Sequence, residues 1–432
     1  MLDSCELNVW LGNAEMSGQI VGSEEWWELV KQFGTPFITL TGDLTCDVLF
    51  LWRDPQGNEH CSETASVLLD VNSLTDHHSW EPTCLERIAG SNVWIGQLTI
   101  DSRWRGSYSF IPIKRHQLPN VVQKTQSDSS ESQRRWWLDV AKNQTADKLN
   151  VSPELVSGWG MSSPLHLPGA VKEVGWSEWE QGLLSSISVD RIQIIRWSDA
   201  VLGNQRDCWL FSTAAGEAPL VVLLDGQKWS ASSGTLSVLQ HLTDTKKIAP
   251  AHYLLIPSID GKTRWKELGC HFPFWQSLIS NLLPIVQIQL SHSQRSISDY
   301  VVAGQSLGGL SALYAGLVFP EYFSKVISLS GSFWWPEESR MRDAKLSESQ
   351  SVVPNGLADQ ILQNQVSVTH LNVFMTVGVG EEDMHLYNEV TCEAIKRKGG
   401  AVYFDRVYGG HDWLSWRSGL VNGLRYLMPV MS

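Results

Sequence analysis

The feature that most constrains the fold of this chain is a series of strand-length apolar runs in its second half. From about residue 190, these runs alternate with segments whose apolar residues recur at helical spacing. Near-continuous apolar strands are typical of a mostly parallel sheet, because helices bury both of its faces. We therefore predict an α/β domain with the strands IQIIRW, CWLFST, PLVVLLD, HYLLIP, YVVAGQS, KVISLSG, NVFMTVG and AVYFDRV.

The first ~165 residues show a different pattern, in which short segments of alternating polarity are separated by turns. Strands of this kind predict an antiparallel β-sandwich. A single core seldom extends over a chain of 432 residues. We therefore predict an N-terminal β-sandwich domain at 1–165, a linker at 166–189 and an α/β domain at 190–432. The wider stretch 125–190 is polar, and we expect it to be a partly helical connector.

Composition narrows the classes of partner and compartment. The net charge of −13 argues against binding to nucleic acid or to anionic membranes. No basic stretch followed by an apolar one begins the chain, and no apolar run is long enough to span a bilayer. The seven cysteines are scattered, odd in number and free of CxxC spacing, which indicates reduced thiols. We expect a cytoplasmic protein without a structural zinc site. The sequence predicts no oligomeric state.

Gly304-Gln-Ser306-Leu-Gly308 matches the pattern GxSxG. The bare pattern is weak, since a serine between glycines also occurs in idle turns. Its context is specific, because a β-rich run precedes it and a helical pattern follows at once. A strand, a tight turn and a helix in this order expose the serine hydroxyl and direct the helix N-terminus at a developing oxyanion. We predict a serine hydrolase of the α/β-hydrolase type with Ser306 as its nucleophile.

Such an enzyme places its acid and then its histidine after the serine. His411 follows the predicted strand AVYFDRV, where catalytic residues collect, whereas His385 lies in a helical pattern. We predict His411 as the general base. Three consecutive carboxylates follow the strand NVFMTVG, and each could orient the imidazole. Glu381 is the first choice and Asp383 the second, with Glu382 as the remaining alternative.

One oxyanion donor should be the backbone N–H of Leu307, which follows the nucleophile. The second should be the backbone N–H of Gln227, in the turn after PLVVLLD. Metal binding is not expected. Glu381 and His385 have i, i+4 spacing, and the adjacent pair at 77–78 is histidine, but neither pair brings a third ligand.

Longer segments in both halves of the chain give a resemblance to a known family. These segments are FLWRDPQGNE (50–59), LTDHH (74–78), RIAG (87–90) with Trp94, WRGSYSFIP (104–112), LLDGQKW (223–229), VVAGQSLGGLSALYAGL (301–317), SGSFWWP (330–336) and GGHDWLSWRSGL (409–420). In them the sequence resembles the enterochelin esterases, cytoplasmic hydrolases that cleave iron-loaded enterobactin, a cyclic triester of 2,3-dihydroxybenzoyl-serine. Related catalytic domains occur in other esterases and in acyltransferases, but those do not resemble the N-terminal half.

The resemblance implies the same two domains, with Ser306 and His411 as nucleophile and base. It places the oxyanion donors at Leu307 and Gln227. It favours Glu381 as the acid, because relatives carry a carboxylate three residues after the glycine that matches Gly378. It implies a ferric catecholate siderophore as substrate and no cofactor, since the iron arrives bound to the substrate. The alternatives are an esterase for other aryl or acyl esters, and a siderophore-binding protein without activity.

A bulky catecholate anion calls for guanidinium groups and flat aromatic walls. Arg264 and Arg417 fall in the segments near the predicted catalytic loops, although Arg264 could instead form an ion pair with Glu267. Most of the 21 tryptophans are expected to be core residues. The predicted aromatic contacts are Trp334, Trp335 and Trp416, and further arginine candidates in the N-terminal half are Arg53, Arg103 and Arg105.

Overall fold

The computed structural model describes residues 19–76, 79–119, 129–156, 160–230, 234–336 and 356–430. By its contacts the chain forms two compact units. The first comprises Met1–Val171 together with Tyr408–Leu414, and the second comprises Lys172–Val407 and Ser415–Ser432. The two histidines at 77–78 lie outside the described residues. Among those described, no helix is both long and apolar enough to cross a membrane.

The first unit is built on an antiparallel sheet of eight strands in the order β1-β2-β5-β4-β3-β6-β8-β7. Two longer helices, α2 and α4, accompany the sheet. Its elements are α2 (Glu24–Phe33), β1 (Phe37–Leu40), β2 (Thr45–Arg53), β3 (Thr64–Val71), β4 (Cys84–Arg87), β5 (Val93–Asp101), β6 (Arg105–Lys114), η1 (Arg115–Gln117), α4 (Ser129–Val140), η2 (Ala141–Asn143), β7 (Leu155–Val156) and β8 (Met161–His166).

Alternation along these strands produces a core between two halves of the sheet and a second apolar layer outside it. Val48 and Phe50 of β2 lie in one core cluster with Val67 and Leu69 of β3. The neighbouring Leu49 and Leu51 instead pack with the tryptophans of α2. Successive strand residues point to opposite faces, so one strand serves both layers. The other outer face packs on α4, which places part of the stretch expected to be a connector against the sheet.

The second unit contains a mixed sheet of eight strands in the order β16-β15-β14-β13-β11-β12-β10-β9. The strands from β12 to β16 and β11 run parallel, while β10 is antiparallel to both of its neighbours. These are the strands expected from the apolar runs, and the predicted fold class is confirmed. Their bounds are β9 (Gln193–Asp199), β10 (Asn204–Ser212), β11 (Glu217–Leu224), β12 (His252–Ile256), β13 (Ser296–Gln305), β14 (Lys325–Leu329), β15 (Asn372–Gly378) and β16 (Ala401–Val407).

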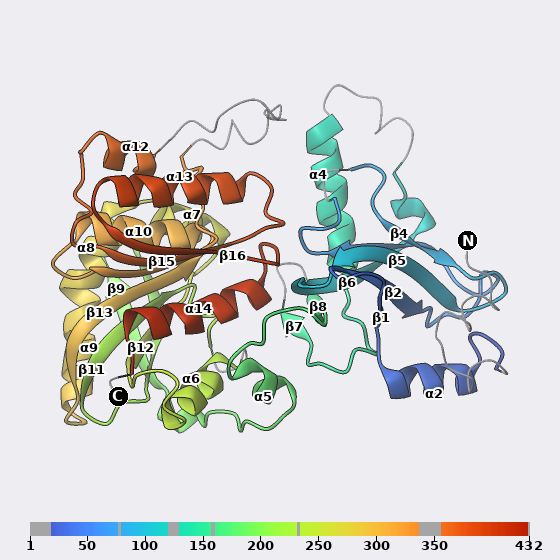
Figure 1. Cartoon of the computed structure of the whole chain (residues 1–432), viewed down its shortest axis with the longest axis horizontal. Coiled ribbons are helices and arrows are strands. Elements are labelled where there is room, and N and C mark those ends of the chain that lie inside the picture. The colour runs from blue at the N-terminus through green and yellow to red at the C-terminus, as the bar shows by residue number, and fades with distance from the viewer. Residues whose placement is uncertain are drawn as a thin grey trace. The chain divides into compact units, whose positions relative to one another are not determined.

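Helices cover both faces of this sheet, as Figure 1 shows for α10 and α13 on one side of β15 and α14 on the other. Val326 of β14 belongs to the core cluster that includes α10 and α13, whereas Ile327 lies beneath Gly423 of α14. The helices are α5 (Trp176–Glu180), η3 (Val189–Arg191), α6 (Thr235–Asp244), α7 (Gly261–Leu268), α8 (Phe272–Ser277), the π-helix η5 (Leu278–Leu282), α9 (Leu283–Ser291), α10 (Leu307–Val318), α12 (Leu357–Leu362), α13 (Met384–Arg397) and α14 (Trp413–Leu427).

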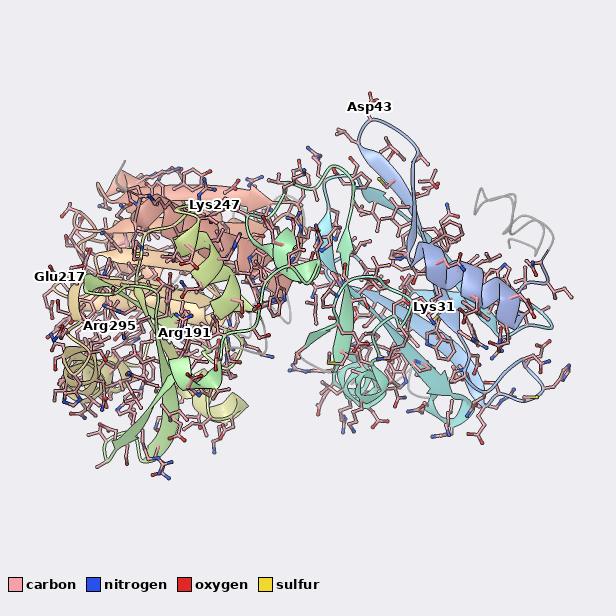
Figure 2. All side chains as sticks on the ribbon, turned by 90° about the horizontal axis from the view of Figure 1, so that it is seen from below. Lys31, Asp43, Arg191, Glu217, Lys247 and Arg295 are labelled. Carbon is pink, nitrogen blue, oxygen red and sulfur yellow. The ribbon has the colours of Figure 1, made fainter. Side chains whose placement is uncertain are left out.

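The two ends of the parallel strands differ in what they carry. Glu217 begins β11 and is paired with Ser296 at the start of β13, next to Arg295, so Figure 2 marks this amino-terminal edge by Glu217 and Arg295. Every catalytic residue predicted for this unit lies in a loop after the carboxyl end of a strand, at the opposite edge of the sheet. Loops at the carboxyl ends of parallel strands are where open α/β sheets form their sites.

Candidate active site

Ser306 lies alone between β13 and α10, in a backbone conformation that non-glycine residues rarely adopt. Its φ is 57° and its ψ is −123°. Its N–H donates to the carbonyl oxygen of Leu329 at 2.8 Å, and its own carbonyl oxygen accepts from the N–H of Ser332 at 3.1 Å. Hydrogen bonds on both sides of the peptide hold this strained turn in place. The side chain is half-buried, as a nucleophile facing a site must be.

The two glycines of the motif contribute unequally to the turn. A Cβ on Gly304 would lie 2.4 Å from the carbonyl oxygen of Gly308, so only glycine fits there. A Cβ on Gly308 would meet nothing closer than 3.5 Å. Of the two glycines, only Gly304 is therefore sterically required for the tight turn.

The helix that follows supplies the first predicted oxyanion donor. Leu307 is the first residue of α10, a helix of 12 residues, and its side chain is buried. The first N–H groups of a helix have no acceptor within it and carry the positive end of its dipole. The Ser306 Oγ lies 3.4 Å from the Oγ of Ser332, a neighbour that the sequence did not single out.

The second predicted donor, Gln227, lies in the turn after β11. Asp225 begins the turn with a φ of 54°, and the N–H of Gly226 donates to the carbonyl oxygen of Ile256 at 2.8 Å. The side-chain Oε1 of Gln227 accepts from the N–H of Ser258 at 2.9 Å. Its side chain is thereby fixed to the loop after β12.

Arg264 supports the same turn. Its Nε and Nη2 donate to the two carboxylate oxygens of Asp225 at 2.9 and 2.8 Å, a forked ion pair with the carboxylate buried. The alternative considered for Arg264, an ion pair with Glu267, is not formed, because Glu267 is paired with Arg206 in the interior and Arg264 with Asp225. With 29% of its side chain exposed, Arg264 also reaches the surface.

The three carboxylates after β15 occupy different environments. Glu381 is buried, and its Oε1 accepts from the Oγ of Ser330 at 2.6 Å and from the N–H of Gly378 at 2.7 Å. Glu382 is exposed, and Asp383 lies at the N-cap position of α13 without a capping hydrogen bond from its side chain. Of the three, Glu381 has the burial and the fixed orientation that a triad acid needs.

Trp416 is joined to this acid through a serine rather than placed on an open surface. Its Nε1 donates to the Oγ of Ser330 at 3.0 Å, and Ser330 in turn donates to Glu381. Trp334 and Trp335 are half-buried and form an aromatic cluster with Trp265, with ring centroids 5.8 and 4.9 Å from that of Trp265. The structure therefore brings two of the three predicted indoles together.

Arg417 is not available for the substrate contact predicted for it. The residue is only 1% exposed, and its guanidinium lies between the carboxylates of Glu173 and Glu180 and over the ring of Trp176. Burial acts to lower the pKa of Arg417, but the two carboxylates outweigh it and raise the pKa. Arg417 is an interior ion-pair residue, because its stem and charge are both enclosed.

The arginine candidates of the N-terminal half all have partners within the first unit. Arg53 pairs with Glu24, and Arg103 forms a forked pair with Asp101. The Nε of Arg105 donates to the Nδ1 of His166 at 3.0 Å. None of these contacts distinguishes them as substrate ligands.

His411 lies in the segment Tyr408–Leu414 after β16, which by its contacts belongs to the first unit, whereas Ser306 and Glu381 belong to the second. The side chain is half-buried. The structure thus groups Ser306, the two oxyanion candidates and Glu381 at the carboxyl edge of one sheet. It places the predicted base, His411, on a segment that by its contacts is part of the first unit.

Sequence reasoning missed Ser330 and Ser332, which contact the acid and the nucleophile. Both belong to SGSFWWP, directly after the strand that neighbours the nucleophile's strand. The carboxyl ends of adjacent parallel strands meet at one edge, so their position was a usable signal. In that segment only Trp334 and Trp335 are predicted as site residues from the sequence.

Comparison with known proteins covers both halves of the chain. Residues 47–176 match the family described as enterochelin esterase, N-terminal, and residues 206–427 match the family described as putative esterase. An iron(III) enterobactin esterase of Dickeya dadantii is 37% identical over 419 residues, which cover 96% of this chain and 94% of the relative.

Solved structures agree over the same length. The enterobactin esterase of Shigella flexneri, determined in the presence of enterobactin, is 34% identical with a TM-score of 0.80, over 94% of this chain and 98% of that one. The ferric enterobactin esterase of Salmonella typhimurium is 33% identical with a TM-score of 0.81 over the same shares. Identity at this level over both units carries the family and not the fold alone. This chain belongs to the enterobactin esterase family.

Proposed function

We propose that this chain is a serine esterase that hydrolyses the ester bonds of ferric enterobactin and releases 2,3-dihydroxybenzoyl-serine units. The observation that carries the proposal is the strained Ser306 turn, with a buried, hydrogen-bonded Glu381 at the same edge of the sheet, in a chain that matches enterobactin esterases along both units. A serine held in this conformation is costly to the fold, and such strain collects at reacting positions.

In the proposed reaction the Ser306 hydroxyl attacks the ester carbonyl while His411 takes its proton. The backbone N–H groups of Leu307 and Gln227 stabilise the oxyanion of the tetrahedral intermediate. The intermediate collapses as His411 returns the proton to the departing seryl oxygen, which leaves an acyl-enzyme. Water, deprotonated by His411, then attacks the acyl-enzyme and restores the Ser306 hydroxyl. Glu381 orients the imidazole and stabilises its charged form.

We infer that iron enters the site as part of the substrate and that the chain itself brings no cofactor. Catecholate oxygens carry the negative charge of such a substrate, and its rings are flat. The Trp265, Trp334 and Trp335 cluster offers faces on which those rings can stack. The exposed part of Arg264 supplies a positive charge near the oxyanion turn.

The proposed compartment is the cytoplasm. The six cysteines in the described part of the chain are all free, at Cys46, Cys61, Cys84, Cys208, Cys270 and Cys392. Free thiols persist where the environment is reducing. Fractionation of the producing cells followed by activity on ferric enterobactin tests this assignment.

The test of the proposed function is the Ser306→Ala variant. We expect it to bind ferric enterobactin as the wild type does but to release product at less than about a hundredth of the wild-type rate, because the oxyanion donors remain while the nucleophile is gone. Ser298→Ala, an exposed position on the same strand, is the matched control. Product is followed by chromatography.

Two outcomes would contradict the proposed function. A wild-type protein that cleaves p-nitrophenyl acetate but leaves ferric enterobactin intact would act on another class of ester. A wild-type protein that binds the ferric siderophore and cleaves neither compound would be a binding protein.

A further inference from the structure

We infer that the first unit takes part in catalysis by positioning the backbone of His411, through Asn72, Ser73 and Ser107. This inference rests on the proposed function in one respect, the role of His411 as general base. None of the three residues touches the reacting atoms, so they are positioning residues. The segment Tyr408–Leu414 is the part of the chain on which they act.

Both peptide groups of His411 are bonded to one turn of the first unit. The N–H of His411 donates to the Oγ of Ser73 at 3.1 Å, and its carbonyl oxygen accepts from the Nδ2 of Asn72 at 3.3 Å. Ser73 in turn donates its hydroxyl hydrogen to the Oδ1 of Asn72 at 2.9 Å. The two side chains therefore form a closed clamp on a single residue, the one that carries the imidazole.

The residue before the histidine fits the clamp only as glycine. A Cβ on Gly410 would lie 2.3 Å from the Oγ of Ser73 and 2.6 Å from the Oδ1 of Asn72. Such distances are far below van der Waals contact. The close approach of the Gly410 backbone to the side chains of Ser73 and Asn72 therefore requires glycine at this position.

Asp412, the residue after the histidine, is hydrogen-bonded to Ser107 of β6. The buried carboxylate of Asp412 accepts from the N–H of Ser107 at 2.8 Å and from its Oγ at 2.5 Å. Its other oxygen accepts from the N–H of Leu414 at 2.8 Å. Hydrogen bonds to a carboxylate are roughly twice as strong as those between neutral groups. Asp412 thus ties the end of the segment Tyr408–Leu414 to β6.

Supports for the clamp come from the same two strands. The N–H of Asn72 donates to the carbonyl oxygen of Ser107 at 3.0 Å, so the turn after β3 is bonded to β6. At the start of the segment, the N–H of Arg105 donates to the carbonyl oxygen of Tyr408 at 2.8 Å, and the guanidinium of Arg103 lies 3.7 Å from the centroid of the Tyr408 ring. The segment is held at its beginning, its middle and its end.

These contacts have a specific catalytic consequence. A general base must lie within hydrogen-bond reach of its proton, and a misplacement of about 1 Å can cost on the order of 100-fold in rate. A unit that only held the siderophore would affect KM for that substrate. A unit that positions His411 affects kcat for every ester that Ser306 attacks, however small.

The experiment compares full-length variants on two substrates. Asn72→Ala/Ser73→Ala removes the clamp, and Ser107→Ala removes one of the two donors to Asp412. Ser109→Ala is the matched control, because Ser109 lies two residues along β6, is buried, and bonds to Gln144 and Asp70. Each variant is assayed for kcat and KM on p-nitrophenyl acetate and on ferric enterobactin, well below its melting midpoint. The rate at which a fluorophosphonate labels Ser306 gives a readout free of siderophore binding.

For the double variant we expect kcat to fall by about 10- to 100-fold on both esters, with labelling slowed in proportion and KM unchanged. Ser107→Ala should show the same pattern to a smaller extent, and Ser109→Ala should match the wild type. Wild-type rates of labelling and of acetate cleavage in both clamp variants would overturn the inference. So would a loss confined to KM for ferric enterobactin. A wild-type protein that cleaves only the small ester would overturn the proposed substrate and leave this inference standing.

Discussion

Glu381 and Ser330 show how a single contact separates residues that look alike in sequence. Glu381, Glu382 and Asp383 are consecutive carboxylates, yet only the first is buried and accepts from both Ser330 and Gly378. A carboxylate fixed in this way holds its charge in one direction, as a triad acid does. Exposure of Glu382 and the helix-capping position of Asp383 are ordinary for acids at the start of a helix.

The first prediction at this scale is a rank order among the three acids. Glu381→Gln should lower kcat by on the order of 100-fold or more, because the charge that stabilises the imidazolium of His411 is lost. Asp383→Asn and Glu382→Gln should stay within about threefold of the wild type. Steady-state hydrolysis of p-nitrophenyl acetate measures all three. A largest effect at Asp383 would identify that residue as the acid, and three mild effects would indicate a Ser–His dyad.

A second prediction concerns the serine that the acid depends on. Ser330→Ala should lower kcat by about tenfold, since Glu381 loses a donor and the Nε1 of Trp416 loses its acceptor, each worth about 1–3 kcal/mol when buried. Ser328→Ala is the control, because the buried Oγ of Ser328 on β14 has no hydrogen-bond partner among the described residues. Equal activity of the two variants would show that Ser330 does not support the acid.

At the residue scale, the sequence predicted which side chains could act in catalysis, but it could not predict which residues those side chains would contact. Ser306, Leu307 and Glu381 follow predicted strands, and the structure places each at the strand end expected from the pattern. The role of Arg417 was misjudged, because proximity to a catalytic loop along the chain says nothing about which way a helix turns its side chains. Its partners Glu173 and Glu180 are more than 200 residues away in sequence.

At the scale of elements, α14 is anchored by a buried charge. Arg417 leaves the helix toward Glu173 and Glu180 and stacks on Trp176, so one residue joins α14 to α5 and the segment before it. Removing one partner of a buried ion pair strongly destabilises the fold. In the intact pair, the attraction between the charges roughly offsets the cost of taking both out of water. The helix that follows the catalytic segment is therefore sensitive to this single position.

We predict that Arg417→Met lowers the free energy of unfolding by about 3–5 kcal/mol, because two carboxylates are left without their cation. Arg425→Met, on the exposed side of the same helix, should change it by less than about 0.5 kcal/mol. Denaturant unfolding followed by tryptophan fluorescence gives both values. An unchanged unfolding midpoint with a raised KM for ferric enterobactin would instead indicate that Arg417 contacts the substrate.

The turn after β2 is held by a buried carboxylate with several donors. Burial acts to raise the pKa of Asp54, but hydrogen bonds from Ser62, the N–H of Gln56, Arg87 and Trp94 outweigh it and lower the pKa. Arg87 is the charged partner, at 2.5 Å. The turn joins β2 to β3, the strand that ends at the His411 clamp.

A pH prediction follows for this turn. A carboxyl whose pKa is lower in the folded state stabilises the fold above the unfolded value of about 4, and that contribution is lost as the pH falls through the folded pKa. The melting midpoint of Asp54→Asn should therefore lie below that of the wild type at pH 7, and the gap should narrow below pH about 4. Asp43→Asn, in the exposed loop between β1 and β2 (Figure 2), should melt as the wild type does at both pH values. A constant gap would show that Asp54 acts by packing alone.

Element prediction succeeded where one physical signal dominates. The apolar runs of the second half became β9 to β16, because the central strands of such a sheet are buried on both faces and near-continuous apolar runs have few other solutions. The stretch 125–190 was harder, since α4 and β8 are rich in polar residues and resemble a linker in composition, although β8 is mostly buried. The place of α4 on the sheet depends on partners such as Leu68 and Ile111, which periodicity does not reveal.

At the scale of the whole molecule, the sequence indicated two units, but it could not indicate which unit each segment joins. Residues 408–414 are flanked on both sides by chain of the second unit and yet pack with the first. No local pattern encodes this, because the contacts of Asn72 and Ser73 with His411 span more than 330 residues. Long-range backbone contacts of this kind are visible only in three dimensions.

The packing of residues 408–414 with the first unit has a consequence for recombination. If enterobactin esterases exchanged N-terminal units, by evolution or by design, a junction at Val171 alone would separate Ser73 and Ser107 from the histidine loop that fits them. Seven residues near the opposite end of the chain, Tyr408–Leu414, belong to the same inherited block. Functional chimeras would therefore need two breakpoints bracketing that loop besides the one at the unit boundary, and natural mosaics that lack them would be expected to be rare.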